Sequence, residues 1–116
     1  MAITSEFLGN LGGKVERIPV SVPEVGVATE LMSFSFPAGQ TFLVGAIGKC
    51  TKYPGLSTSY PVIKVTGREG VKPDNPRNPW GATGVVSGDA EITFTPRGGA
   101  TLEADFSGEV FWARVS

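Results

Sequence analysis

The sequence predicts an all-β domain: an antiparallel β-sandwich, jelly-roll-like, or a small barrel, with an extended N-terminal arm and a long proline-rich loop. Short runs along the chain alternate apolar and polar side chains, which is the period of a half-buried strand. Sixteen glycines and nine prolines among 116 residues separate these runs at near-regular spacing. No window follows the 3.6-residue period of an amphipathic helix. The length corresponds to a single domain.

The first strands are expected at an edge. Residues 14–22 and 25–29 are rich in β-branched side chains, and Pro19 and Pro23 interrupt them. Proline has no backbone N–H to donate to a neighbouring strand, so it is confined to edges, bulges or extended arms. We therefore place both runs at a sheet edge or in an arm.

Three strands are expected in the middle of the chain. In the first, Met32, Phe34 and Phe36 face one way and the serines between them face the other. The second and third strands cover residues 41–50 and 60–66. Gly45 and Gly48 in the second strand indicate a bulge or a close approach of another backbone.

The C-terminal third has the clearest alternation. Apolar residues occupy every second position in 90–94 and again in 102–106, and residues 110–115 are apolar on both faces. Turn residues separate these runs, including Pro96 to Gly99 and Ser107-Gly108. Together they predict a four-stranded antiparallel meander over residues 84–115.

The N-terminal residues 1–13 stand apart from the expected domain, residues 14–116. They hold three large apolar residues, Phe7, Leu8 and Leu11, among three glycines. One alternative is a frayed terminus. The other is an arm that packs these three side chains on a neighbouring subunit, since they are costly to leave in water.

The segment 68–83 is expected to be a stiff loop inside the domain. Pro73, Pro76 and Pro79 fix their own φ angles and hold the residues before them extended. Trp80 follows at once, outside any strand pattern. It either packs on its own domain or anchors an interface, where tryptophan is enriched. We list these four residues as candidate interface residues.

Charge and composition exclude several classes of protein. Ten basic and eleven acidic residues give a net charge of −1 without any Lys/Arg run, so no nucleic-acid partner is expected. No apolar stretch is long enough to span a membrane as a helix. The lone Cys50 cannot form an internal disulfide, and no secretory leader is recognisable. We expect a soluble protein that folds in the cytoplasm.

The residues offer little for catalysis. The chain has no histidine, the commonest general base and transition-metal ligand. Glu91, Glu103 and Asp105 lie on strands predicted to be neighbours, but they occupy the polar positions of an open face rather than a cleft. We expect no enzyme activity, no metal and no cofactor. Tyr53 and Tyr60 are candidate surface aromatics near two lysines.

An apolar N-terminal arm, a compact all-β body without catalytic residues, low charge and one rigid loop together resemble the capsid decoration, or cement, proteins of tailed bacteriophages. This resemblance of organisation covers the whole chain and contains no diagnostic motif. It implies a virion protein, made in the host cytoplasm, that forms a homo-oligomer, often a trimer. Such an oligomer would bridge major capsid subunits and stabilise the shell.

Two alternatives remain open. A tail or baseplate component would have the same sequence features. A carbohydrate- or receptor-binding β-module would use exposed aromatic residues, with Trp80, Tyr53 and Tyr60 as candidates.

Overall fold

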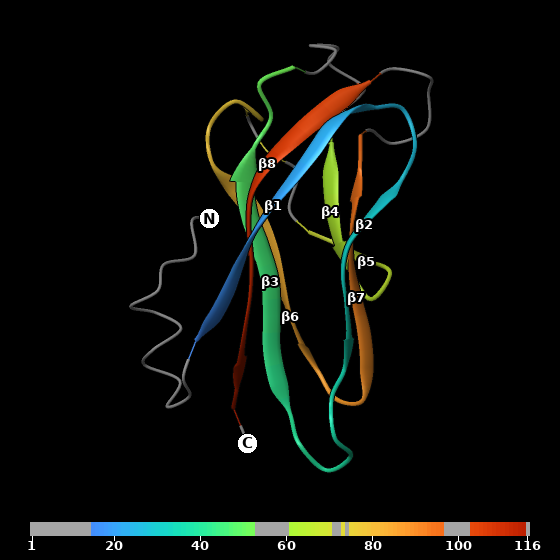
Figure 1. Ribbon diagram of the computed structural model, residues 1–116, viewed down its shortest axis with the longest axis vertical. Coiled ribbons are helices and arrows are strands. Elements are labelled where there is room, and N and C mark those ends of the chain that lie inside the picture. Colours follow the sequence, from blue (N-terminus) through green and yellow to red (C-terminus); the bar gives the residue numbers. More distant parts are fainter. Residues whose placement is uncertain (1–14, 53–60, 71–72, 74, 97–102, 116) are drawn as a thin grey trace.

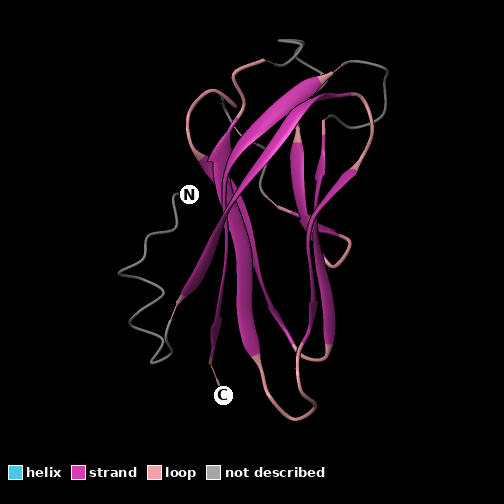
Figure 2. Cartoon of the chain, in the orientation of Figure 1, coloured by secondary structure: helices cyan, strands magenta, loops and turns pink. Residues whose placement is uncertain are grey.

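The computed structural model describes residues 15–52, 61–70, 73, 75–96 and 103–115. These residues form two four-stranded antiparallel sheets packed as a sandwich, which confirms the predicted fold class (Figure 2). Sheet A has the strand order β1-β8-β3-β6, and sheet B has the order β2-β7-β4-β5. The strands are β1 (Glu16–Val25), β2 (Thr29–Ser35), β3 (Phe42–Lys49), β4 (Val62–Val65), β5 (Arg68–Glu69), β6 (Trp80–Val86), β7 (Asp89–Thr95) and β8 (Ala104–Arg114).

The topology is that of a jelly roll. Four antiparallel pairs are nested along the sequence: β1 with β8, β2 with β7, β3 with β6, and β4 with β5. Two further pairings, β3 with β8 and β4 with β7, close these ribbons into two sheets. The chain is thus one long hairpin with its tip between β4 and β5, rolled so that successive strands alternate between sheets on either side of that tip, while β4 and β5 share sheet B (Figure 1).

This rolling makes the predicted meander over residues 84–115 wrong. β6 and β7 lie in different sheets, so the turn at Gly88 crosses the sandwich instead of closing a hairpin. Residues 104–106 and 110–114, from the two C-terminal runs predicted as separate strands, lie on one continuous strand, β8. Sequence alternation located these segments correctly, but it could not show which segments pair.

Ser107-Gly108 lies within β8 because that part of the strand has a partner on each side. Gly108 is level with Val20 of β1 and with Gly48 of β3. Its backbone therefore pairs within a sheet, and the missing side chains of Gly48 and Gly108 allow the two strands to approach closely instead of forming a turn. A Cβ atom on Gly48 would overlap the backbone carbonyl oxygen of Ser107 and lie 2.8 Å from the Gly108 Cα. The predicted close backbone approach in β3 is confirmed there.

Most of the remaining strands lie where the pattern predicted them, but the predicted run 25–29 is mainly the turn between β1 and β2, with only its end residues in strands. β1 is an outer strand of sheet A and contains both Pro19 and Pro23, as expected for an edge. Its register against β8 shifts between Val22 and Val25. The expected strands in the middle of the chain correspond to β2, β3 and β4.

The core lies between the sheets. Phe94, Phe106, Ile63 and Ile92 are almost completely buried there. β8 is apolar on both faces, as predicted: Val110 points into this core, whereas Phe111 joins Leu43 in a small separate cluster. Val15, Ile47 and Val115 pack against that second cluster.

Candidate binding surface at one end of the sandwich

The proline-rich segment is shorter than the sequence suggested. Residues 68–69 form β5, and Trp80 begins β6, so the connection between the two strands covers residues 70–79. Of this connection, the structure describes Gly70, Pro73 and residues 75–79. Pro73 and Pro76 are buried, whereas Pro79 is exposed. The prolines therefore do not share one surface.

Hydrogen bonds fix the described part of this loop. The side-chain oxygen of Asn75 accepts from the Arg77 N–H at 3.1 Å, and its carbonyl accepts from the Asn78 N–H at 2.9 Å. This is a local turn in which asparagine substitutes for a backbone acceptor. The Cys50 N–H donates to the Pro76 carbonyl at 2.8 Å and joins the loop to the end of β3.

Trp80 lies in the core of its own domain. Its side chain is only 6 % exposed, and its ring meets the Phe106 ring edge-on, with centroids 5.4 Å apart at 89°. Of the two alternatives for this residue, packing on its own domain describes its position. It is not a surface platform on which a sugar ring could stack. Trp80 instead anchors the end of the loop to the sandwich.

A second loop at the same end is held by Asp105 of β8. The Asp105 carboxylate accepts hydrogen bonds from the N–H groups of Thr51 and Lys52 at 2.7 and 2.8 Å, and from the Thr51 hydroxyl. The Asp105 N–H in turn donates to the Lys52 carbonyl at 3.0 Å. One carboxylate thus satisfies two backbone N–H groups where β3 ends.

These contacts perturb the ionisation of two groups. Partial burial by itself would raise the pKa of Asp105, but the hydrogen bonds from Thr51 and Lys52 outweigh it and hold that pKa below its usual value. Burial, assisted by the negative charge of Asp105, raises the pKa of Cys50 to about 12. The Cys50 thiol is therefore protonated at neutral pH and is no nucleophile.

The loops leave a polar surface at this end of the sandwich, which we call the end surface. It consists of exposed side chains on two anchored loops: Thr51, Lys52, Asn75, Arg77, Asn78 and Pro79. At its border, Lys52 Nζ lies 3.8 Å from Glu24 Oε2. The end surface offers hydrogen-bonding groups and the positive charges of Lys52 and Arg77 on hydrogen-bonded backbone, with the negative charge of Glu24 at its border. Such a surface is suited to docking.

The predicted acidic face does not exist as one surface. Glu91 lies on β7 in sheet B, whereas Asp105 lies on β8 in sheet A, so the strands expected to be neighbours belong to opposite layers. Asp105 serves the loop contact instead. Within the described residues, no three His, Cys, Asp or Glu side chains are close enough together to hold a metal ion. No helix in that part of the chain could cross a membrane.

Several predicted site residues lie outside the described part of the chain: Phe7, Leu8 and Leu11 of the arm, and Tyr53 and Tyr60. Sequence reasoning missed the Asp105–Thr51 contact, which joins residues 54 positions apart. No local motif could have indicated it, because the two residues meet only through the pairing of β3 with β8. Comparisons with protein-family models, curated proteins and solved structures found no match.

Proposed function

We propose that this chain is a non-enzymatic structural protein of a virus particle, which decorates the capsid and stabilises it by bridging major capsid subunits. The observation that carries the proposal is the end surface, where two anchored loops present a fixed polar contact. A contact whose backbone is already fixed loses little conformational entropy when it binds. A small loss of conformational entropy on binding favours a protein that must hold a stable contact between shell subunits.

The architecture supports the same proposal by analogy. Jelly rolls occur in viral capsid proteins, lectins and cupins, and fold alone does not decide among them. The chain has no histidine to build a metal centre of the usual imidazole type. Trp80, the tryptophan considered for sugar stacking, is buried. A structural virion role requires neither a metal nor an exposed tryptophan.

Stabilisation would arise from mass action and multivalency. A protein that binds only the assembled shell lowers the free energy of that state relative to the open one. Copies that contact two shell subunits at once raise the effective concentration of each contact. The resemblance to decoration proteins adds the expectation of a homo-oligomer with several such contacts.

The test uses shells assembled from the major capsid protein of the same virus without this chain. Purified full-length protein is added, and binding is measured by co-sedimentation together with the temperature at which the shells open. We expect saturable binding and a higher opening temperature. Shells that bind none of the wild-type protein would refute the proposed function.

A pair of variants tests the end surface itself. Asn78→Glu with Pro79→Glu adds two carboxylates to it, and we expect at least about tenfold weaker binding. The control, Pro37→Glu with Ala38→Glu, makes a matched change in the exposed β2–β3 loop at the opposite end of the sandwich (Figure 1). Equal loss of binding in both variants would show that the end surface is not the contact. Deletion of residues 1–13 tests the arm separately and is expected to weaken binding.

A further inference from the structure

β6 differs from the other outer strands because none of the features that usually protect a free edge is found among its residues. Outer strands usually carry prolines, charges, bulges or very short lengths that prevent other chains from pairing with them. β1 has Pro19 and Pro23, β2 has a register shift next to Glu30, and β5 has only two residues. β6 is seven residues long, and its sequence WGATGVV has neither a charge nor a proline.

The pairing of β6 with β3 is regular along its whole length, from Phe42 opposite Val86 to Gly48 opposite Trp80. β6 is therefore a continuous strand without a bulge. No other described strand pairs with its outer side. The N–H and C=O groups that point to that side are thus available to a further strand.

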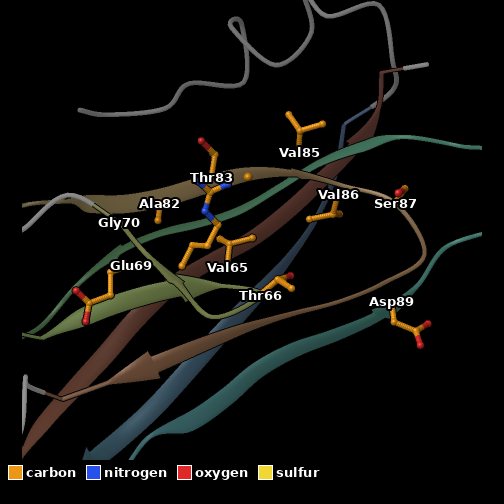
Figure 3. A pocket seen from close by; sticks show the side chains of 12 residues that line it. Val65, Thr66, Glu69, Gly70, Ala82, Thr83, Val85, Val86, Ser87 and Asp89 are labelled. Atoms are coloured by element: carbon orange, nitrogen blue, oxygen red, sulfur yellow. The ribbon is translucent and has the colours of Figure 1, made fainter.

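A groove of about 570 Å³ runs along this edge, between β6 and the β4–β5 hairpin (Figure 3). Its lining combines small and apolar residues, such as Val65, Ala82 and Gly84, with polar and charged ones, which include Arg68, Glu69 and Asp89. In Figure 3 the side chain of Val86 points towards the interior, whereas that of Val85 points away on the outer face. Val85 is 66 % exposed, which is unusual for a large aliphatic side chain on a strand.

We propose that β6 is a self-association edge, to which β6 of a second copy adds in antiparallel orientation about a two-fold axis at Thr83. Sheet A would then continue from one copy into the next as a single eight-stranded sheet. This inference does not depend on the proposed function, because it concerns the isolated chain.

The register of such a pair is self-complementary. With Thr83 opposite its own copy, Val85 lies opposite Gly81 of the second chain, so each exposed valine covers a position without a side chain. On the inner face, Trp80 lies opposite Val86, and Ala82 lies opposite Gly84. Since β6 has no charged residue, the pairing brings no like charges together.

The groove side carries charges of both signs: Arg68 and Glu69 on β5, and Asp89 at the start of β7. None of these charges lies on β6, so the two strands that would pair are themselves uncharged. Closed two-fold dimers are also the commonest symmetric assemblies. A second copy is thus an occupant that suits the chemistry of the edge.

The first experiment measures the mass of the full-length protein by analytical ultracentrifugation over a range of concentrations. We expect a monomer–dimer equilibrium that approaches twice the 12.1 kDa chain mass. Val85→Lys should raise the dimer dissociation constant at least about tenfold, because it places a charge in the pairing edge. Val27→Lys is the matched control. Val27 is 70 % exposed and lies away from β6, so the dissociation constant of the Val27→Lys dimer should equal that of the wild type.

The second experiment tests the register. Residues directly opposite in an antiparallel pair have Cα atoms about 4.5–5.5 Å apart, which suits a disulfide. Thr83→Cys should therefore form a covalent dimer under mild oxidation much faster than Val27→Cys. The native Cys50 is buried and does not compete. Circular dichroism confirms that each variant is folded.

Several outcomes would overturn the proposal. A strict monomer at about 100 µM would do so, as would the trimer that the resemblance implies. A dimer unaffected by Val85→Lys would show that another surface pairs. Equal rates of cross-linking for Thr83→Cys and Val27→Cys would exclude the two-fold register. None of these results bears on binding to shells, so the two proposals fail separately.

Discussion

Replacement of Trp80 by alanine should strongly destabilise the fold, because the indole fills the core where the proline-rich loop meets the sandwich. The side chain is 6 % exposed and packs edge-on against Phe106. Truncation of a buried tryptophan costs about 3–5 kcal/mol, and the lost ring pair accounts for about 0.5–1.5 kcal/mol of that. A domain has only about 5–15 kcal/mol of unfolding free energy. Trp80→Ala should therefore remove a large fraction of it.

The assay is equilibrium unfolding in urea, followed by far-UV circular dichroism, because the substitution itself removes one of the two tryptophan fluorophores. With a slope of roughly 2 kcal/mol per molar urea, the midpoint should fall by about 2 M. Trp80→Phe keeps an aromatic ring towards Phe106 and should lose less.

Pro79→Ala provides the control from the adjacent position. Pro79 is exposed, so its replacement acts mainly through the entropy of the unfolded chain and should cost less than about 1 kcal/mol. If Trp80→Ala changed the unfolding free energy by no more than Pro79→Ala, the indole would not be a core residue in solution. The alternative that Trp80 contacts a partner at an interface would then be favoured.

Two other contacts give measurable outcomes by the same assay. Asp105→Asn should cost about 1–2 kcal/mol at pH 7, because the hydrogen bonds that Thr51 and Lys52 donate to this side chain lose their charged acceptor. Folding lowers the pKa of Asp105, so the Asp105 carboxylate contributes to stability above the ordinary pKa of about 3.9, and this contribution is lost as the pH falls through the folded pKa. If the wild type were still more stable than Asp105→Asn by the same amount at pH 2, this reasoning would be contradicted. Gly48→Ala should cost at least about 2 kcal/mol because its Cβ would overlap the backbone carbonyl oxygen of Ser107 as well as the Phe106 ring. Gly39→Ala is the control: the added Cβ would have open space around it, and only the φ of +82° would be strained, so a loss of about 1 kcal/mol is expected. Equal losses of stability in the two glycine variants would argue against the steric reasoning.

The candidate sites were predictable to different degrees. Alternation marked the apolar face of β7, and the prolines at 19 and 23 marked β1 as an edge strand, because both properties depend on adjacent residues. The position of Trp80 was left open, since a tryptophan after a proline loop can pack inwards or outwards. The Asp105 contact was missed because its partners are far away in the sequence.

The sequence by itself determined that the chain is all-β, where most of its strands lie, and that it has no histidine chemistry. These properties follow from side-chain type and from the two-residue period of a strand, which are local. Only the tertiary structure decided that the strands roll into a jelly roll, that β8 passes straight through Ser107-Gly108, and that β6 is an outer strand of sheet A. The reason is physical: pairing joins strands as distant as β1 and β8, and it is selected by the packing of the whole core rather than by any one segment.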